Sequence, residues 1–292
     1  MIEPIYWLNG RLVSAAEAVI PLNDHGLLYG DGVFEGIRFY NRRPFRLADH
    51  LERLELSARA LMLALPHRTA LEAAVTETIA AFAGADGYLR LVITRGAGSL
   101  GLDPGHCERP SLFVIADKVT LVSESRRRSG LDLITASTRR PGPTVLDPRI
   151  KSLNYLNNIL AKLEARRAGA DEALLLNERG QVAEGTAENL FIARRGRLCT
   201  PPVSDGALDG ITRGIVLELC RQEGIEAVER SLTPYDVHTA DECFLCGTGA
   251  ELLPVRTVDG RPMGHCPGPL TERVRRAYQA IIELETTTRS EQ

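Results

Sequence analysis

The 292-residue chain has the composition of an ordinary folded protein, with 44% hydrophobic and 25% charged residues. A chain of this length forms one large domain or two of medium size. Its 35 Lys plus Arg and 38 Asp plus Glu give a formal net charge of −3. The chain therefore lacks the basic excess that binding to nucleic acid or to an anionic membrane usually requires. We expect a small-molecule partner, no nucleic acid and no membrane.

The N-terminus and the cysteines predict a cytoplasmic protein. Met1–Trp7 contains an acid and a proline where a secretory signal carries basic residues and a long apolar run. The densest apolar stretch, Ala60–Leu65, falls far short of the ~20 residues that span a bilayer. Six cysteines in this length do not indicate a disulfide framework. We interpret Cys243 and Cys246 as buried strand residues and expect no metal, because no second C-x-x-C pair accompanies them.

Residues 1–120 are predicted to form a small N-terminal α+β domain with its own core. Asn9-Gly10 is a strong two-residue turn signal between apolar segments, and it indicates a hairpin over residues 5–13. An apolar stripe with helical spacing runs from Leu51 to Leu65 and leaves Arg53 off the stripe. The other expected elements are a hairpin of Gly32–Phe39 with Pro44–Leu47, a helix over residues 71–82, and strands at Tyr88–Thr94 and Ser111–Ala116.

The polar, turn-rich residues 121–130 are predicted to link this domain to a larger one, residues 131–292, in which short strands outnumber helices. One helix of the larger domain is expected to start near Ser152, with an apolar stripe of Leu153, Leu156, Leu160 and Leu163. The other expected elements are strands at Leu131–Ser137, Ala173–Leu176, Gln181–Glu184 and Leu190–Ala193, and helices at about 211–223 and 269–285.

The segment Gly96–Gly101 fits the G-x-G-x-x-G pattern of dinucleotide-binding sites and follows a predicted strand. Such a pattern should open a helix, but Pro104 and Gly105 follow, and both disfavour one. We interpret the segment as a loop over a site. The chain contains no P-loop motif and no H-E-x-x-H motif.

Six separated segments together resemble one family of enzymes. They read HGLLYGDGVFEGIR (His25–Arg38), HLERL (His50–Leu54), KSLNYLNN (Lys151–Asn158), EGTAENLF (Glu184–Phe191), GITR (Gly210–Arg213) and GTGAE (Gly247–Glu251). In this order, and over nearly the whole chain, they are similar to the fold-type IV enzymes that use pyridoxal 5′-phosphate (PLP), and among these to the branched-chain amino-acid aminotransferases. The resemblance implies an α+β, two-domain fold whose larger C-terminal domain is a pseudo-barrel of short strands. It also implies a homodimer.

The resemblance implies that Lys151 is the lysine that binds the cofactor. The helix expected from Ser152 would set the ammonium beside the positive end of a helix dipole, which helps to keep the amine neutral. We also expect Lys151 to move the proton between the substrate Cα and C4′ of the cofactor. By the same resemblance, Glu184 stabilises the protonated ring nitrogen and Tyr155 bonds the phenolic oxygen.

The phosphate of the cofactor needs hydrogen-bond donors. A helix that opens at Ile211 and Thr212 offers free backbone N–H groups and a hydroxyl. The resemblance implies further donors in the segment of Gly247 and Thr248, and an ion pair with Arg53.

A substrate pocket is implied as well. Tyr88 and Arg90 lie two apart on a predicted strand, so both point to one face. By resemblance, Arg90 and Tyr29 hold the γ-carboxylate of glutamate, and the amides of Thr248 and Gly249 take the α-carboxylate. The implied substrate-binding residues, with aromatic walls suited to leucine, isoleucine or valine, are Tyr29, Phe34, Gly36, Arg38, Tyr88, Arg90, Gly249 and Ala250. The expected reaction is transamination between these L-amino acids and 2-oxoglutarate.

Two other activities occur on the same scaffold. D-amino-acid aminotransferases share Lys-Ser-Leu-Asn and Glu-Gly-Thr, but they usually lack the Tyr-x-Arg pair and an aromatic residue at the position of Tyr155. Aminodeoxychorismate lyases eliminate pyruvate, and the aromatic pocket around Phe34 argues weakly against that reaction. A vitamin-binding protein without activity is disfavoured, because Lys151, Glu184 and Arg53 are all intact.

Overall fold

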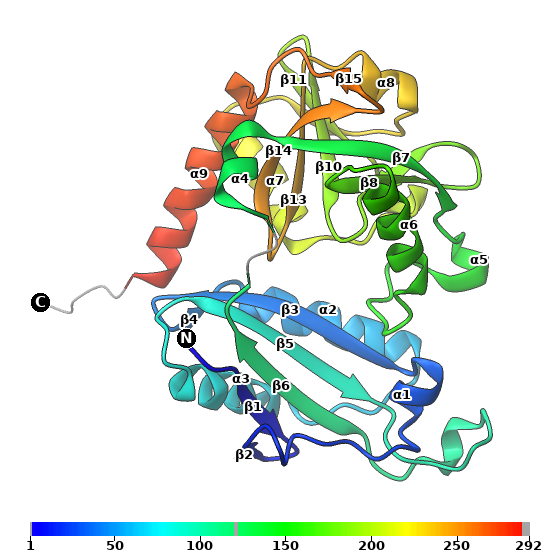
Figure 1. Cartoon of the computed structure of the whole chain (residues 1–292). Helices are drawn as coiled ribbons and strands as arrows, with labels where there is room; N and C mark the ends of the chain where they lie inside the picture. Colours follow the sequence, from blue (N-terminus) through cyan, green and yellow to red (C-terminus); the bar gives the residue numbers. More distant parts are fainter. Residues whose placement is uncertain (1, 120–121, 288–292) are drawn as a thin grey trace, which may run out of the picture. The chain divides into compact units, whose positions relative to one another are not determined.

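The computed structural model describes residues 2–119 and 122–287 (Figure 1). By the contacts within the chain, the described residues divide into two compact units. The first unit takes them from Met1–Val119, Ile150–Asn154 and Ile282–Gln292, and the second from Thr120–Arg149 and Tyr155–Ile281. The predicted boundaries at residues 120 and 131 stay predictions. Residue 121 of the predicted linker lies outside the described residues, and the rest of that linker contains helix α4, Glu124–Ser129.

The first unit is a six-stranded antiparallel sheet with helices on one face. Its strands follow the order β2-β1-β6-β5-β3-β4. They are β1 Ile5–Leu8, β2 Arg11–Val13, β3 Gly32–Tyr40, β4 Arg43–Pro44, β5 Gly87–Thr94 and β6 Ser111–Asp117. The helices are α1 His25–Tyr29, α2 Leu47–Ala60 and α3 Arg68–Ala81, with a 3-10 turn, η1, at Pro104–His106.

Alternation along β3 separates the core of this unit from a second sheet face. Val33, Ile37 and Phe39 belong to the buried cluster that the sheet shares with α2 and α3. Because successive side chains of a strand point to opposite faces, the even-numbered residues of β3 lie on the other face. This second face carries several of the predicted site residues.

The second unit contains a nine-stranded mixed sheet in the order β12-β11-β10-β13-β14-β7-β8-β9, with β15 paired to β14. The strands are β7 Leu131–Arg139, β8 Glu172–Leu176, β9 Val182–Glu184, β10 Asn189–Arg194, β11 Arg197–Thr200, β12 Ala227–Glu229, β13 Glu242–Gly247, β14 Glu251–Val258 and β15 Arg261–Pro262. The other elements are α5 Pro143–Leu146, α6 Leu156–Arg167, η2 Val203–Asp205, α7 Ile211–Gln222, α8 Pro234–His238 and α9 Pro269–Thr286, the end of which belongs to the first unit.

Most of the predicted elements are confirmed, including the α+β class and the hairpin through Asn9-Gly10. In that turn both residues have positive φ, as a two-residue hairpin turn of this type requires. The strand expected at Pro44–Leu47 is wrong, because β4 ends at Pro44 and Leu47 begins α2. No helix opens at Gly96–Gly101, as predicted.

The helix predicted from Ser152 is wrong in both its start and its buried face. Residues 151–154 are not helical: Ser152 bridges to Val33, and the Leu153 N–H donates to the Gly32 carbonyl at 3.0 Å. Helix α6 begins only at Leu156. Its small residues Ala161 and Ala165 pack on β7 and β8. Leucines of the predicted stripe are instead exposed.

The cysteine interpretation is confirmed for the strand pair. Cys243 and Cys246 lie on β13 and are both buried. Burial raises the pKa of each thiol well above its usual range. In the part of the chain that the structure describes, no helix is both long and apolar enough to cross a membrane.

Candidate functional site

One face of the first unit's sheet gathers the predicted substrate residues of β3 and β5. Phe34, Gly36 and Arg38 follow one another at every second position of β3. In the ladder with β5, Gly36 pairs with Arg90 and Arg38 pairs with Tyr88. Because directly paired residues of neighbouring strands point to the same face, these five residues form one surface.

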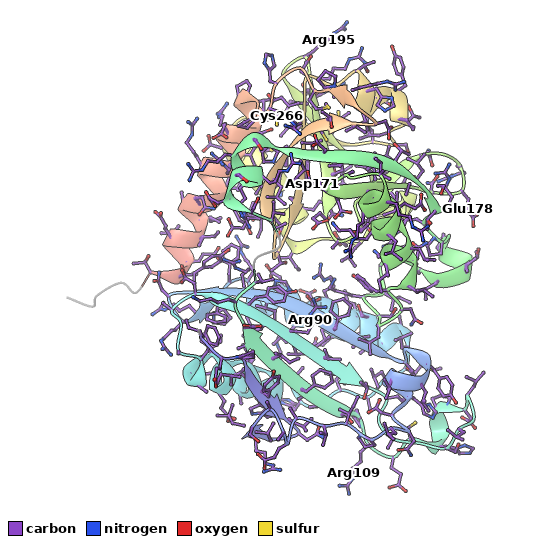
Figure 2. All side chains as sticks on the ribbon, viewed as in Figure 1. Arg90, Arg109, Asp171, Glu178, Arg195 and Cys266 are labelled. Atoms are coloured by element: carbon purple, nitrogen blue, oxygen red, sulfur yellow. The ribbon has the colours of Figure 1, made fainter. Side chains whose placement is uncertain are left out.

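Cation–aromatic packing orders this surface. The Arg90 guanidinium carbon lies 4.5 Å from the centroid of the Phe34 ring and 5.7 Å from that of Tyr88 (Arg90 is labelled in Figure 2). The Tyr88 hydroxyl occupies the space that a Cβ on Gly36 would take. Glycine is therefore required at residue 36, because any larger residue would displace the Tyr88 hydroxyl from its place over β3.

Lys151 lies beside the same surface because the segment 151–154 pairs with β3. The Phe34 N–H donates to the Lys151 carbonyl at 3.1 Å, and the Lys151 N–H donates to Ser57 Oγ at 3.1 Å. The Lys151 ammonium nitrogen lies 4.5 Å from the Phe34 ring centroid. We expected the dipole of this helix to help keep the Lys151 amine neutral. That expectation is wrong, because α6 starts five residues after Lys151. The position of Lys151 is fixed by its backbone hydrogen bond with Phe34 of β3 and not by a helix terminus.

Arg53 projects from α2 into a buried ion cluster. Its Nε and Nη2 donate to the two oxygens of Glu35 at 2.8 and 2.7 Å, and His50 Nδ1 lies 2.7 Å from the same carboxylate. Burial alone would raise the pKa of Glu35, but the charges of Arg53 and His50 outweigh it and hold that pKa well below its usual range. His50 Nε2 is buried without a hydrogen-bond partner. Glu35 thus fixes the orientation of the arginine that we expect at the phosphate.

Tyr29 ends α1, beside the loop of Gly96–Pro104. Its hydroxyl donates to the Leu100 carbonyl at 2.5 Å, and its ring packs edge-on against His25. His25 Nε2 in turn lies 2.8 Å from the carbonyl of Ser99. Two residues of the motif that begins at His25 therefore tie this loop to α1.

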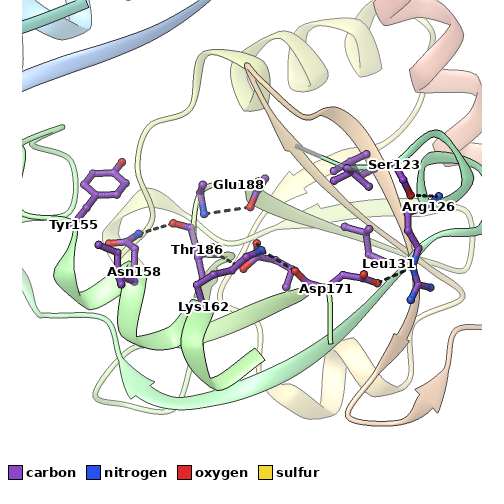
Figure 3. Close-up of a pocket in the computed structure, with 14 residues that line it drawn as sticks. Ser123, Arg126, Leu131, Tyr155, Asn158, Lys162, Asp171, Thr186 and Glu188 are labelled. Carbon is purple, nitrogen blue, oxygen red and sulfur yellow. Dashed lines mark hydrogen bonds and ion pairs between the residues drawn. The ribbon is translucent and has the colours of Figure 1, made fainter. Parts of the chain in front are cut away.

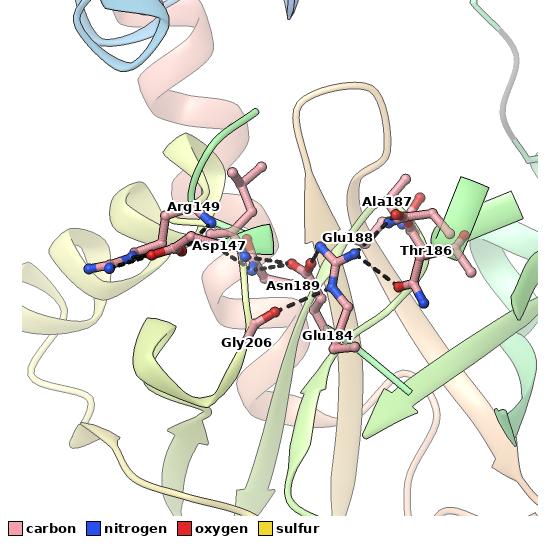
Figure 4. Close-up of polar contacts among 12 residues, drawn as sticks. Asp147, Arg149, Glu184, Thr186, Ala187, Glu188, Asn189 and Gly206 are labelled. Carbon is pink, nitrogen blue, oxygen red and sulfur yellow. Dashed lines mark hydrogen bonds and ion pairs between the residues drawn. The ribbon is translucent and has the colours of Figure 1, made fainter. Parts of the chain in front are cut away.

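In the second unit, Glu184 lies at the end of β9 in a buried polar network (Figure 4). One oxygen accepts from Arg140, and the other accepts from the Leu208 N–H at 2.9 Å and from Asn189 at 3.3 Å. A carboxylate has about four acceptor sites, so one site is left for a further donor. Arg140 is itself fixed by Asn158 Oδ1 at 3.0 Å.

Asn189 joins three of the predicted segments. Besides Glu184, its side-chain nitrogen donates to the Leu208 carbonyl at 3.0 Å. Its backbone pairs with Cys246, which precedes the predicted segment Gly247–Thr248. A Cβ on Gly210 would overlap its side-chain oxygen, so only glycine lets α7 start this close. The ends of β9 and β13 and the start of α7 therefore meet around one asparagine.

The N-terminus of α7 provides the donors that an anion requires. Its cap residue, Gly210, makes no side-chain capping bond, and Ile211 and Thr212 supply the first N–H groups of a 12-residue helix. Thr212 is buried. Arg213 anchors this end of the helix by donating to Glu229 at 2.6 Å and to the Pro201 carbonyl at 3.0 Å.

A tight turn joins β13 to β14. Gly247 pairs with Glu251, which leaves Thr248, Gly249 and Ala250 in the turn. The Ala250 carbonyl accepts from Arg127 at 3.1 Å. The predicted donors Thr248 and Gly249 thus lie beside the strand end that pairs with Asn189.

Tyr155, just before α6, lines a cavity of about 470 Å³ within the second unit (Figure 3). The loop after Glu184 forms another wall of the cavity. Its Thr186 is held on both sides: the carbonyl accepts from Asn158 at 2.6 Å, and the N–H donates to Glu172 at 3.2 Å. Lys162, one turn after Asn158, pairs with the same Glu172 at 2.6 Å.

Each unit carries residues that fit a part of PLP. In the second unit, the uncapped N-terminus of α7 and the buried hydroxyl of Thr212 can bind a dianionic phosphate. In the first unit, Arg53 is a cation that Glu35 orients. The buried carboxyl of Glu184 has one acceptor site left, which can bond a protonated ring nitrogen. Tyr155 supplies a hydroxyl for the phenolic oxygen, and Lys151 an amine.

Three supporting residues were missed by sequence reasoning: Glu35, Arg140 and Asn189. Glu35 and Asn189 lie inside segments of the family pattern, but no spacing indicated what they bond. Arg140 lies outside every segment. One compositional signal was also missed, because the chain has only three lysines, at residues 118, 151 and 162. Lys118 is exposed and Lys162 is paired with Glu172, so a search for the cofactor lysine has few candidates.

Comparisons with known proteins show the family of this chain. Residues 32–258 match the family described as Amino-transferase class IV. The chain is 46% identical over 278 residues to a putative branched-chain-amino-acid aminotransferase of Methanocaldococcus jannaschii, and the match covers 94% of this chain and 95% of that protein. It is also 36% identical to a D-alanine aminotransferase of Bacillus licheniformis, with 95% of this chain and 97% of that protein covered.

A solved structure is similar over almost its full length. It is the branched-chain amino acid aminotransferase of Thermobaculum terrenum in its PLP form. The TM-score is 0.84 at 34% sequence identity, and the match covers 95% of this chain and 93% of that chain.

Proposed function

This chain belongs to the class IV aminotransferases, and on that basis we propose that it transfers amino groups between branched-chain L-amino acids and 2-oxoglutarate. The fold is that of the fold-type IV enzymes, and PLP is the cofactor. One observation carries the substrate class: Phe34, Tyr88 and Arg90 share a sheet face with the Lys151 ammonium. An aromatic wall beside a cation suits an apolar side chain in one half-reaction and a carboxylate in the other.

We assign Lys151 two roles, covalent attachment of the cofactor and proton transfer. Bound PLP supplies an electron sink that makes the substrate Cα–H acidic. Lys151, held by Ser57 and by the backbone of Phe34, takes the proton from Cα as a base and returns a proton to C4′ as an acid. Its rigid attachment to β3 limits the positions that the amine can reach, which favours proton transfer between two nearby carbon atoms.

The remaining cofactor contacts are assigned to both units. Glu184, which Arg140 orients, holds the proton on the ring nitrogen. Tyr155 donates to the phenolic oxygen. The phosphate is bound by Arg53, Ile211, Thr212 and the segment of Gly247 and Thr248.

The substrate contacts are proposals of the same kind. Tyr29 and Arg90 hold the γ-carboxylate of glutamate, and the turn amides from Thr248 to Ala250 take the α-carboxylate. Phe34, Gly36, Arg38 and Tyr88 form the wall for the branched side chain. Gly36 matters because it leaves room for the Tyr88 hydroxyl.

A half-reaction experiment tests this function. The holoenzyme is mixed separately with L-leucine and with D-alanine while the absorbance band of the bound cofactor is followed. We expect L-leucine to bleach the band and 2-oxoglutarate to restore it with formation of glutamate. Bleaching by D-alanine alone would assign the chain to the D-specific enzymes. Release of pyruvate from aminodeoxychorismate without an amino acceptor would instead identify a lyase.

We also propose a homodimer in the cytoplasm. The support for the dimer is an apolar stripe on α6: Leu156, Ile159, Leu160 and Leu163 are 66, 53, 46 and 41% exposed. Four large apolar residues in one helical stripe are more than scattered surface residues, and such stripes mark protein interfaces. A second copy of the chain is the natural occupant, because the same stripe then covers itself across a two-fold axis. The cytoplasmic location stays a prediction from the sequence.

A further inference from the structure

Helix α4 carries three consecutive arginines in different environments. The last of them, Arg128, is exposed and pairs with Glu124 one turn earlier. The middle one, Arg127, is half-buried, and its Nη1 donates to the Ala250 carbonyl at 3.1 Å. Ala250 belongs to the turn between β13 and β14, and α4 lies beside β14 (Figure 1). Arg127 therefore bonds a turn that we assign to the substrate α-carboxylate, and the proposed function gives this arginine no role.

Helix α4 is anchored firmly enough to hold another segment in place. The first arginine, Arg126, has its Nη1 3.2 Å from the Asp132 carboxylate on β7 and its Nε 3.3 Å from the Asp171 carboxylate just before β8. Ser123 caps the helix by accepting from the Arg126 N–H. The side chain of Arg127 thus starts from a helix that is fixed to the sheet of the second unit.

The turn that Arg127 bonds contains an uncommon backbone conformation. Glu251, which follows Ala250, has a φ of 59°, in the left-handed region that residues with a side chain rarely adopt. Such a conformation persists where its surroundings hold it. Because a peptide unit is planar, the Ala250 carbonyl and the Glu251 N–H rotate together, and this rotation changes the φ of Glu251. The bond from Arg127 fixes the direction of the carbonyl and so opposes the rotation.

Two further contacts hold the ends of the turn. Gln279 on α9 donates from Nε2 to Glu251 Oε2 at 2.9 Å. Gly247 pairs with Glu251 in the ladder between β13 and β14. The amides of Thr248 and Gly249, to which we assign the α-carboxylate, lie between these fixed points. Their direction therefore depends on the shape of the turn.

Resting on the proposed function, we propose that Arg127 is a positioning residue that sets the affinity of the turn for the α-carboxylate of the substrate. Its guanidinium acts through the Ala250 carbonyl, which keeps the N–H groups of Thr248 and Gly249 directed at the anion. An anion that meets donors already in place binds without reorganising the turn. The carboxylate contact is made both before and during proton transfer, so its loss should raise KM more than it lowers kcat.

Substitutions at adjacent positions of α4 test this role. Arg127→Met keeps the apolar stem and removes the donors, and Arg128→Met is the matched control in the exposed position. In the Arg127→Met holoenzyme we expect the KM for L-leucine to rise roughly tenfold, as for the loss of one hydrogen bond to a charged group, with little change in kcat. Arg127→Lys should restore most of the affinity, because an ammonium can still donate to a carbonyl. An unchanged KM in Arg127→Met would overturn the proposal.

Affinity for the cofactor separates positioning from general support of the fold. The phosphate has other proposed donors on α7, so Arg127→Met apoenzyme should bind PLP with nearly the affinity of the parent. Equilibrium titration followed by absorbance measures this affinity. A loss of PLP affinity as large as the rise in KM would mean that Arg127 merely supports the fold, and it would overturn the proposal.

A probe without an amino group separates this proposal from the proposed function. 4-Methylpentanoate has the carboxylate and side chain of leucine but cannot be transaminated, and calorimetry measures its Kd for the holoenzymes. We expect Arg127→Met to bind it roughly tenfold more weakly than the parent, whether or not L-leucine is turned over. If this ratio holds and L-leucine is no substrate, the proposed function fails and the positioning role stands.

Equal Kd values in an enzyme that transaminates L-leucine would refute the positioning role and leave the function intact. No binding of the probe to the parent holoenzyme would refute the carboxylate role of the turn, and with it the role of Arg127.

Discussion

The pKa values of two glutamates of this protein are shifted in opposite directions because their neighbours differ. Glu35 is bracketed by Arg53 and His50 and stays ionised although it is fully buried. Glu188 lies next to the carboxylate of Glu172, whose cation is already engaged. The pKa of a carboxyl beside cations is therefore lowered, whereas that of a carboxyl beside another carboxylate is raised.

The first prediction concerns Glu184. Glu184→Gln keeps the shape of the side chain but removes the charge that stabilises a protonated ring nitrogen. The loss of one charge-assisted hydrogen bond, roughly 1.5–3 kcal/mol, should lower kcat by roughly 10- to 100-fold. The cofactor should remain bound, because its phosphate donors are unchanged. Single-turnover absorbance with L-leucine measures this rate, and an unchanged kcat would remove Glu184 from its role.

The second prediction concerns Glu35 and acid. Its pKa is held below the ordinary value of 4.5, so its contribution to stability is complete above that pH and is lost as the pH falls further. Thermal melts of the parent should therefore show Tm falling below about pH 4.5, and Glu35→Gln should show a smaller fall. At pH 7 the variant should be less stable by about 3–5 kcal/mol, because Arg53 and His50 lose their buried partner. Parallel Tm curves for the two proteins would contradict this account.

At the scale of secondary-structure elements, α6 shows what a local pattern can and cannot predict. The leucine spacing correctly indicated a helix, but the predicted helix began too early, at Ser152. Periodicity contains no information on backbone pairing with a distant strand. In the structure, residues 151–154 pair with β3 instead, and this pairing is what carries Lys151. The prediction also placed the wrong face of α6 against the core, since the small residues pack on the sheet and the leucines are exposed. An apolar stripe therefore predicts a buried face without saying which molecule buries it.

The exposed stripe of α6 gives the third prediction. Leu160→Glu puts a charge in the middle of the proposed interface and should convert the dimer to a monomer, because an unpaired charge is costly to bury. Light scattering after size exclusion measures the mass directly. Leu284→Glu on α9, an exposed leucine outside the stripe, is the control and should leave the dimer intact. A dimer that persists in Leu160→Glu would place the interface elsewhere.

The start of α7 gives the fourth prediction. In Gly210→Ala the new Cβ would overlap the Asn189 side chain, so the helix end must shift away from Glu184 and β13. Affinity for PLP should fall by at least tenfold, as measured by equilibrium titration of the apoenzyme. Gly214→Ala in the same helix meets no atom within 4 Å, and it should keep the affinity while stabilising the helix by up to about 1 kcal/mol. Equal PLP affinities in the two variants would contradict the packing argument.

For the whole molecule, the sequence predicted the class of fold, the order of most elements and the residues that the family pattern marks. Those predictions succeeded where hydrophobic period and turn residues act locally, as in the hairpin at Asn9-Gly10 or the strand of Tyr88 and Arg90. They failed for partners brought together by folding. Nothing near Arg140 in the sequence indicates that it bonds Glu184, 44 residues away. Supporting residues of this kind are properties of the tertiary structure.

One measurement tests the central claim that this chain is a PLP aminotransferase built around Lys151. Reduction of the holoenzyme with borohydride fixes the cofactor to the lysine that holds it, and peptide mass spectrometry then locates the label. Because the chain has only three lysines, the outcome is unambiguous. The account predicts the phosphopyridoxyl label on Lys151, one per chain, and its loss when L-leucine is added before the reduction. A label on Lys118 or Lys162, or no label, would contradict it.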